Sequence, residues 1–179
     1  MEGERKSTNC GFSLIELIVA VLIMAIMVTA AVMSFSSVNN ARAERAATVS
    51  ASVLKRARQK ALAMDSDTTL YAEFKLDSGT YYGTVCFGTE EIVREKLGND
   101  RLTLKFCNHN GTGTSATVSD SVKVRVYFKK STGGIDHIES TGTGGVHLLS
   151  MVDKLEITGS GDGENVILGK TTGRCYIEE

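Results

Sequence analysis

Glu16 has the most unusual chemical setting in this chain. It is the only charged residue in an apolar block, residues 14–35, that reads LIELIVAVLIMAIMVTAAVMSF. A carboxylate inside hydrocarbon costs ~2.5–3.5 kcal/mol on insertion scales, so an acid at such a position suggests a function. The alternative is that Glu16 lies near the end of the block and reaches the membrane interface at little cost. The residues alone leave both interpretations open.

The other reactive side chains do not form a catalytic pattern. Three histidines are far apart and lack metal-ligand spacing: His109, His137 and His147. No serine lies in GxSxG, and Gly169-Lys170-Thr171 lacks the upstream glycine of a phosphate loop. Residues 159–163 (GSGDG) could offer oxygens to a cation, but a flexible hairpin loop explains them more simply. We therefore expect no enzymatic activity, no cofactor and no metal.

The apolar block predicts a membrane-spanning helix. As a helix it is ~33 Å long, enough to cross a ~30 Å hydrocarbon core. A buried core helix would carry charges on a second face, and a signal peptide would have a shorter apolar region followed by a cleavage site. Orientation is less clear, because six cations follow the block, whereas Arg5 and Lys6 before it are offset by two acids. A positive-inside count would place the C-terminal side in the cytoplasm.

Residues 10–19, CGFSLIELIV, resemble the N-terminal motif of type IV pilins and type II secretion pseudopilins. The shared pattern is a short polar leader ending in Gly11, then Phe12, then a glutamate at the fifth position of the mature chain. The resemblance implies that prepilin peptidase cleaves between Gly11 and Phe12 and methylates the new amine of Phe12. It also implies the opposite orientation to the charge count, with the leader inside and the remainder outside.

The same resemblance implies a role, partners and a location. Other pilin or pseudopilin subunits, an inner-membrane assembly platform and membrane lipid would be the partners. The chain would be a single-pass protein of the cytoplasmic membrane and then part of an extracellular or periplasmic filament. Glu16 would neutralise the Phe12 amine of an adjacent subunit, which turns two unpaired buried charges into one pair and fixes the register of assembly.

The remaining pattern predicts an α+β, pilin-like fold. Small or apolar residues recur every three or four positions in residues 36–64, and neither proline nor glycine occurs between Phe12 and Met64. We predict one long N-terminal helix with a membrane-spanning first half and an amphipathic second half, packed on an all-antiparallel β head. The expected segments are a leader (1–11), a transmembrane half (12–35), an amphipathic half (36–64) and a head (65–179).

The head is predicted to contain roughly eight to ten short strands, because its hydrophobic period changes to two. The expected strands cover residues 70–76, 80–87, 102–106, 122–128, 146–152, 154–158, 165–168 and 174–177, whereas residues 90–97 fit a strand or a short helix. The basic run in residues 54–64 and the strands of residues 154–177 also resemble H-type minor pseudopilins.

Charge is distributed unevenly between the amphipathic half of the helix, which we call the stem, and the head. Residues 36–64 carry six Lys/Arg and one acid, a net of +5, and residues 65–179 carry 12 Lys/Arg and 17 Asp/Glu, a net of −5. The stem charge could be a solvated helix face, could pack against the acidic head, or could attract anionic lipid. The acidic head argues against a DNA-binding competence pilin, so nucleic acid is not an expected partner. A membrane-anchored β-domain protein of another kind is the other alternative.

Three cysteines remain if Cys10 leaves with the leader: Cys86, Cys107 and Cys175. One disulfide between Cys86 and Cys107 would close a loop of about 20 residues and add ~3 kcal/mol in the chain-entropy model. The alternative is three buried free thiols, which behave as small hydrophobic side chains.

Overall fold

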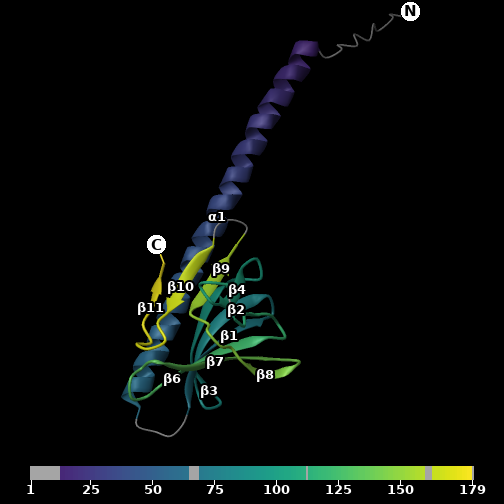
Figure 1. Ribbon diagram of the computed structural model, residues 1–179. Coiled ribbons are helices and arrows are strands. Elements are labelled where there is room, and N and C mark those ends of the chain that lie inside the picture. Colours follow the sequence, from purple (N-terminus) through teal and green to yellow (C-terminus); the bar gives the residue numbers. More distant parts are fainter. Residues whose placement is uncertain (1–12, 65–68, 112, 160–162, 179) are drawn as a thin grey trace, which may run out of the picture. The chain divides into compact units, whose positions relative to one another are not determined.

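The computed structural model describes residues 13–64, 69–111, 113–159 and 163–178. The chain forms two compact units, Met1–Ser37 and Val38–Glu179. The described residues form one helix followed by eleven strands, and Figure 1 shows how these elements are arranged within each unit. The predicted α+β class is confirmed.

Helix α1 spans Leu14–Ala63 and crosses from the first unit into the second. Ser13 directly precedes the helix, and its backbone oxygen accepts hydrogen bonds from the N–H groups of Glu16 (2.9 Å) and Leu17 (3.2 Å). Lys60 in the last turn offsets the negative end of the helix dipole. The predicted continuous helix is confirmed over these bounds, and Phe12 lies outside the described residues.

The strands form two sheets in which every neighbouring pair is antiparallel, as predicted. They are β1 (Leu70–Asp77), β2 (Thr80–Phe87), β3 (Glu90–Asn99), β4 (Thr103–Cys107), β5 (Ala116–Thr117), β6 (Lys123–Phe128), β7 (Ile135–Gly142), β8 (Gly145–Leu148), β9 (Lys154–Thr158), β10 (Glu164–Leu168) and β11 (Cys175–Ile177). One sheet has the order β3-β2-β1-β6-β7-β8 and the other β11-β10-β9-β4-β5.

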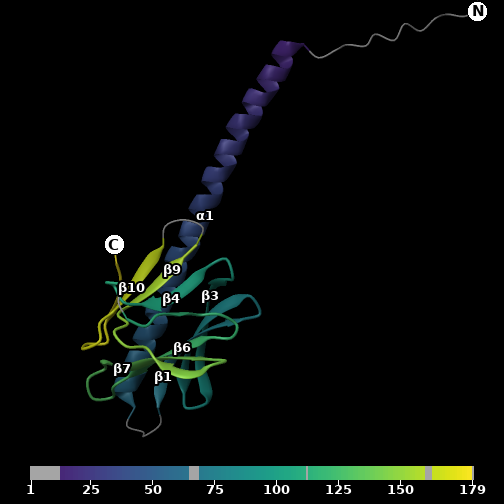
Figure 2. The same cartoon turned by 45° about the vertical axis from the view of Figure 1, so that its right-hand side comes forward.

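The core of the second unit lies between the two sheets and the second half of α1. Figures 1 and 2 show this half of the helix passing behind strands of both sheets. Its buried stripe consists of Ala43, Ala46, Ala47, Ser50, Ala51, Val53, Leu54, Ala57 and Ala61. Small side chains allow close approach, and Gly83 on β2 does the same from the sheet, because a Cβ there would lie 3.2 Å from Val53. The rings of Phe74 and Phe106 join the two sheets with centroids 5.3 Å apart.

Two strands, β7 and β5, were not predicted, and each was missed for a physical reason. In β7 the buried residues are Ile135, Ile138 and Ser140, which breaks strict alternation. The cause is a register irregularity opposite β6, where Val126 pairs with Ile138 but Phe128 pairs with Ile135. Strand β5 has only two residues, too few to show a period. The ambiguous segment 90–97 belongs to strand β3, and the predicted strand 146–152 ends earlier, at Leu148 in β8.

A glycine junction, formed by Arg58, Gly133 and Gly173, ties both sheets to the helix. Arg58 Nε donates to the backbone oxygen of Thr172 (2.9 Å). Gly173 has a φ of +62°, and a Cβ there would lie 1.7 Å from the oxygen of Gly133. Gly133, in the β6–β7 loop, would bring a Cβ to 3.1 Å from Arg58 Nε. This packing therefore requires glycine at Gly173 for both conformation and space.

Candidate functional site

The first turn of α1 presents the carboxylate that the sequence singled out. Glu16 is exposed, and its side chain makes no hydrogen bond or ion pair with any residue that the structure describes. Ser13 and Glu16 also have the S-x-x-E spacing of a capping box, a signal that sequence reasoning missed. A carboxylate in the first turn is favourable to the helix dipole, so Glu16 suits its own helix and remains available to an outside cation.

The first unit has an apolar helix surface that its own chain leaves bare. Leu14–Ala31 has a mean hydropathy of 2.7, and none of this window is buried. A core helix of a soluble protein would be mostly covered, whereas Leu14, Met24 and Met27 are each at least 65% exposed. Among the described residues this is the one helix long and apolar enough to cross a membrane. Such a surface suits surroundings of lipid or of other helices.

One comparison with known proteins identifies the same N-terminal segment. Residues 6–32 match the family model described as the prokaryotic N-terminal methylation motif. No curated protein matches the chain, and no solved structure matches it. The match confirms the predicted resemblance to type IV pilins and pseudopilins, which is a structural and not an enzymatic group. It also fits a membrane-anchored precursor. No finding supports the H-type assignment.

Only some of the predicted site residues lie within the described part of the chain. Glu16 is described, whereas Gly11 and Phe12 lie outside the described residues, so cleavage and N-methylation remain predictions. The loop of residues 159–163 is described only at its two ends. Within the described ranges no three His, Cys, Asp or Glu side chains gather to hold a metal ion.

The three cysteines match one of the two alternatives that the sequence left open. Cys86 belongs to β2 of the six-stranded sheet and Cys107 to β4 of the five-stranded sheet, and both are free and buried, as is Cys175. The Cys86–Cys107 disulfide is therefore not formed, and the alternative of buried free thiols is observed. Burial raises the pKa of all three thiols, that of Cys175 to about 12 although Lys55 and Arg58 act to lower it. Such thiols are poor nucleophiles and serve as packing groups.

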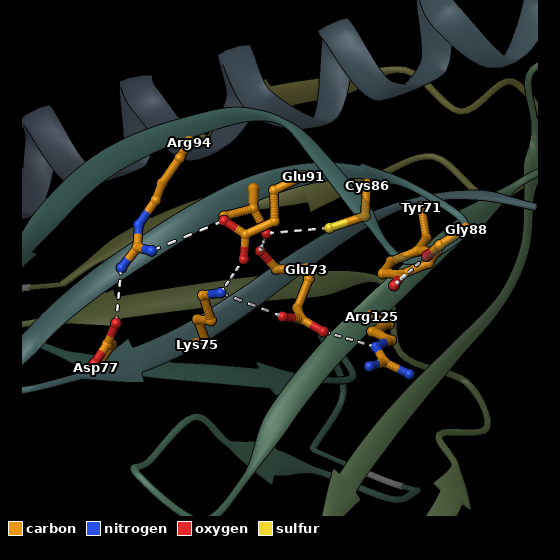
Figure 3. Close-up of polar contacts among 10 residues, drawn as sticks. Tyr71, Glu73, Lys75, Asp77, Cys86, Gly88, Glu91, Arg94 and Arg125 are labelled. Carbon is orange, nitrogen blue, oxygen red and sulfur yellow. Dashed lines mark hydrogen bonds and ion pairs between the residues drawn. The ribbon is translucent and has the colours of Figure 1, made fainter.

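A second polar cluster covers the outer face of the six-stranded sheet, and we call it the outer-face network (Figure 3). Glu73 on β1 is only 5% exposed, and its carboxylate contacts Arg125 Nε at 2.8 Å and Lys75 Nζ at 3.9 Å. Lys75 also pairs with Glu91, and Arg94 pairs with Asp77 at 2.8 Å. Alternate residues of neighbouring strands thus form a continuous chain of opposite charges. The two acids of β1 in this chain, Glu73 and Asp77, are both matched by cations.

An aromatic row lies beside this network, and sequence reasoning did not identify it. The ring of Tyr127 is 5.1 Å from that of Tyr71 and stacks on His137 at 4.2 Å. Arg125 lies over Tyr71, but its guanidinium is already shared between Glu73 and Glu139. A nucleic-acid platform needs unpaired positive charge next to its aromatic rings. This surface therefore does not favour the DNA-binding alternative.

We expect Arg125→Met to reduce the free energy of unfolding by about 2 kcal/mol, because it leaves the buried Glu73 with only the more distant Lys75. The matched control is Lys123→Met on the same strand, since Lys123 has no ion pair in the described part of the chain. Urea unfolding of the full chain in detergent measures both. Adding Glu73→Gln to Arg125→Met should recover part of the loss. Equal stability of the two single variants would show that the network contributes nothing.

Proposed function

We propose that this protein is a structural subunit, a pilin or pseudopilin, of a type IV pilus or a type II secretion-like filament. The observation that carries the proposal is the bare apolar surface of Leu14–Ala31 with a single acid, Glu16, in its first turn, inside a methylation motif. Lipid would cover this surface in the precursor, and the helices of other subunits would cover it in the filament. No catalytic constellation is required.

The proposed topology places the leader in the cytoplasm and the second unit outside. The motif supports this orientation, because prepilin peptidase acts on the cytoplasmic face in the families that the chain resembles. Prepilin peptidase, other subunits and an inner-membrane assembly platform are then the partners. The cations of the stem favour the opposite orientation by the positive-inside rule. The proposed orientation therefore rests on the motif and not on charge.

The chemistry of assembly follows from the end of the helix. Cleavage after Gly11 would leave a positive amine on Phe12, immediately before Ser13 and the first turn of α1. The helix dipole is unfavourable to a cation at this end, so the amine gains little from its own helix. The exposed carboxylate of Glu16 on an adjacent subunit would supply the opposite charge as both groups leave water. Only a subunit docked at the correct height brings the two groups together.

Processing tests the proposal directly. Coexpression with a prepilin peptidase should shorten the chain by the 11 residues of the leader and add a methyl group to the Phe12 amine, as intact-mass spectrometry would measure. Gly11→Leu should block cleavage, because a bulky side chain prevents close approach of the backbone in the protease cleft. Gly3→Leu is the matched control, since it makes the same change away from the scissile bond. An unchanged mass of the wild-type chain would overturn the assignment.

A further inference from the structure

A cationic pocket lies between the second half of α1 and the end of β3, entirely within the second unit. Its volume is about 420 Å³. The lining consists of Arg42, Arg45, Lys96, Leu97, Gly98, Asn99 and Leu102. Three of these side chains are cations and none is an acid. We call this the stem pocket.

The cations of the stem pocket form no ion pair with the described part of the chain. Arg42 makes one long hydrogen bond, 3.4 Å, to the side chain of Asn39, and neither Arg45 nor Lys96 has an ion pair among the described residues. By contrast, another arginine of α1 has an ion pair with β3. Arg56 of α1 pairs with Glu95 of β3 at 2.8 Å, and Glu95 is not among the residues that line the pocket.

The floor of the stem pocket is apolar and well packed. Leu97 and Leu102 are 4% and 3% exposed. A Cβ at Gly98 would lie 2.4 Å from Leu102 Cδ1, so the missing side chain at Gly98 makes room for Leu102 beneath the pocket. Three cations above two leucines form an amphipathic cavity, which suits a ligand with an anionic group attached to an apolar body.

We propose that the stem pocket binds the phosphate headgroup of an anionic membrane lipid. Arginine guanidinium groups recognise phosphate with paired hydrogen bonds, and the pocket supplies two of them. Arg42 follows Phe35, the last residue of the apolar block, by seven positions in the sequence, and seven residues reach at most ~25 Å even when extended. A nucleic acid is less suited, because no aromatic side chain lines the pocket for base stacking. The inference rests on the membrane anchoring in the proposed function and not on filament assembly.

Lipid binding by the full chain tests this inference. The chain is held in zwitterionic detergent and titrated with dihexanoyl-phosphatidylglycerol, dihexanoyl-phosphatidylcholine or inorganic phosphate, and native mass spectrometry counts the bound molecules. We expect phosphatidylglycerol to bind, and Arg42→Gln with Arg45→Gln to weaken it about tenfold or more. The matched control is Lys55→Gln with Lys60→Gln, which removes the same charge from the same helix outside the stem pocket. It should change the affinity less than about twofold.

Several results would overturn the inference. An equal loss in both double variants would mean diffuse attraction to a basic helix. Phosphate that binds as tightly as the lipid would point to a soluble phosphate compound, and an oligonucleotide that binds more tightly than the lipid would point to nucleic acid. If circular dichroism shows that the Arg42/Arg45 variant is misfolded, Lys96→Gln alone provides the same test. Cleavage by prepilin peptidase, measured in parallel, reports on the proposed function independently of lipid binding.

Discussion

Glu16→Ala should abolish incorporation of the subunit into filaments and leave the precursor otherwise intact. Membrane insertion should persist or improve, because an apolar residue replaces a charge. Cleavage after Gly11 should persist, since the scissile bond is unchanged. In the filament, the Phe12 amine would remain buried without a partner, at a cost of ~3–5 kcal/mol per subunit. Filament yield by electron microscopy, together with immunoblots of membrane and filament fractions, measures the effect.

Two variants show whether the effect of Glu16→Ala belongs to the carboxylate. Glu16→Asp should be intermediate, because the shorter arm displaces the charge by one methylene. Thr29→Ala changes another polar residue of the apolar block, whose hydroxyl donates to the oxygen of Ala25 at 2.7 Å, and should assemble normally. If Glu16→Ala assembles as well as the wild type, Glu16 merely reaches the interface. The assay should count filaments initiated as well as subunits incorporated, because a subunit at a filament tip lacks a neighbour on one side.

Gly173→Ala should reduce the free energy of unfolding by at least about 3 kcal/mol. A left-handed conformation at φ +62° is unfavourable for alanine by itself, and the added Cβ would also lie 1.7 Å from the oxygen of Gly133. Backbone atoms cannot turn away as a flexible side chain can, so the β6–β7 loop or the β10–β11 hairpin must move. Urea unfolding followed by circular dichroism measures the change.

Gly111→Ala separates the two parts of that cost. Gly111 has a similar φ of +68°, but apart from its chain neighbours no atom of the described residues lies within 4 Å of the position of an added Cβ. It should therefore lose only the conformational part, roughly 1 kcal/mol. If the two variants are equally stable, the glycine junction is not a tight contact.

The helix and most of the strands could be predicted because their signals are local. The unbroken helical pattern predicted both ends of α1 to within two residues. The alternation of apolar and polar residues predicted the bounds of β1, β2 and β6 to within one residue. Strand β7 escaped because the irregularity opposite Phe128 moves its buried residues out of period. Such irregularities depend on the partner strand, which one segment of sequence does not specify.

The parts of the site that have a local sequence signal could also be predicted, and the parts that depend on tertiary packing could not. Glu16 stood out because one charge in a long apolar block is visible in the sequence. The stem pocket did not, because Arg42 and Lys96 are 54 positions apart and become neighbours only when β3 packs on the helix. The same holds for the cysteines, since strand patterns place Cys86 and Cys107 on strands but do not say that the strands belong to different sheets.

The glycine junction also determines when the second unit can finish folding. Its hydrogen bond from Arg58 to Thr172 joins positions 114 apart, and Ile135 N donates to the oxygen of Lys170 at 2.8 Å, so both contacts require the segment that contains Lys170 and Thr172. Until the segment with Lys170 and Thr172 has been synthesised, the helix lacks these contacts. Contacts so distant along the chain close slowly, because the loop between them must be ordered first. We therefore expect a nascent chain to pass through a period in which chaperones and proteases can reach this helix, and a chain truncated before Lys170 to remain in that state.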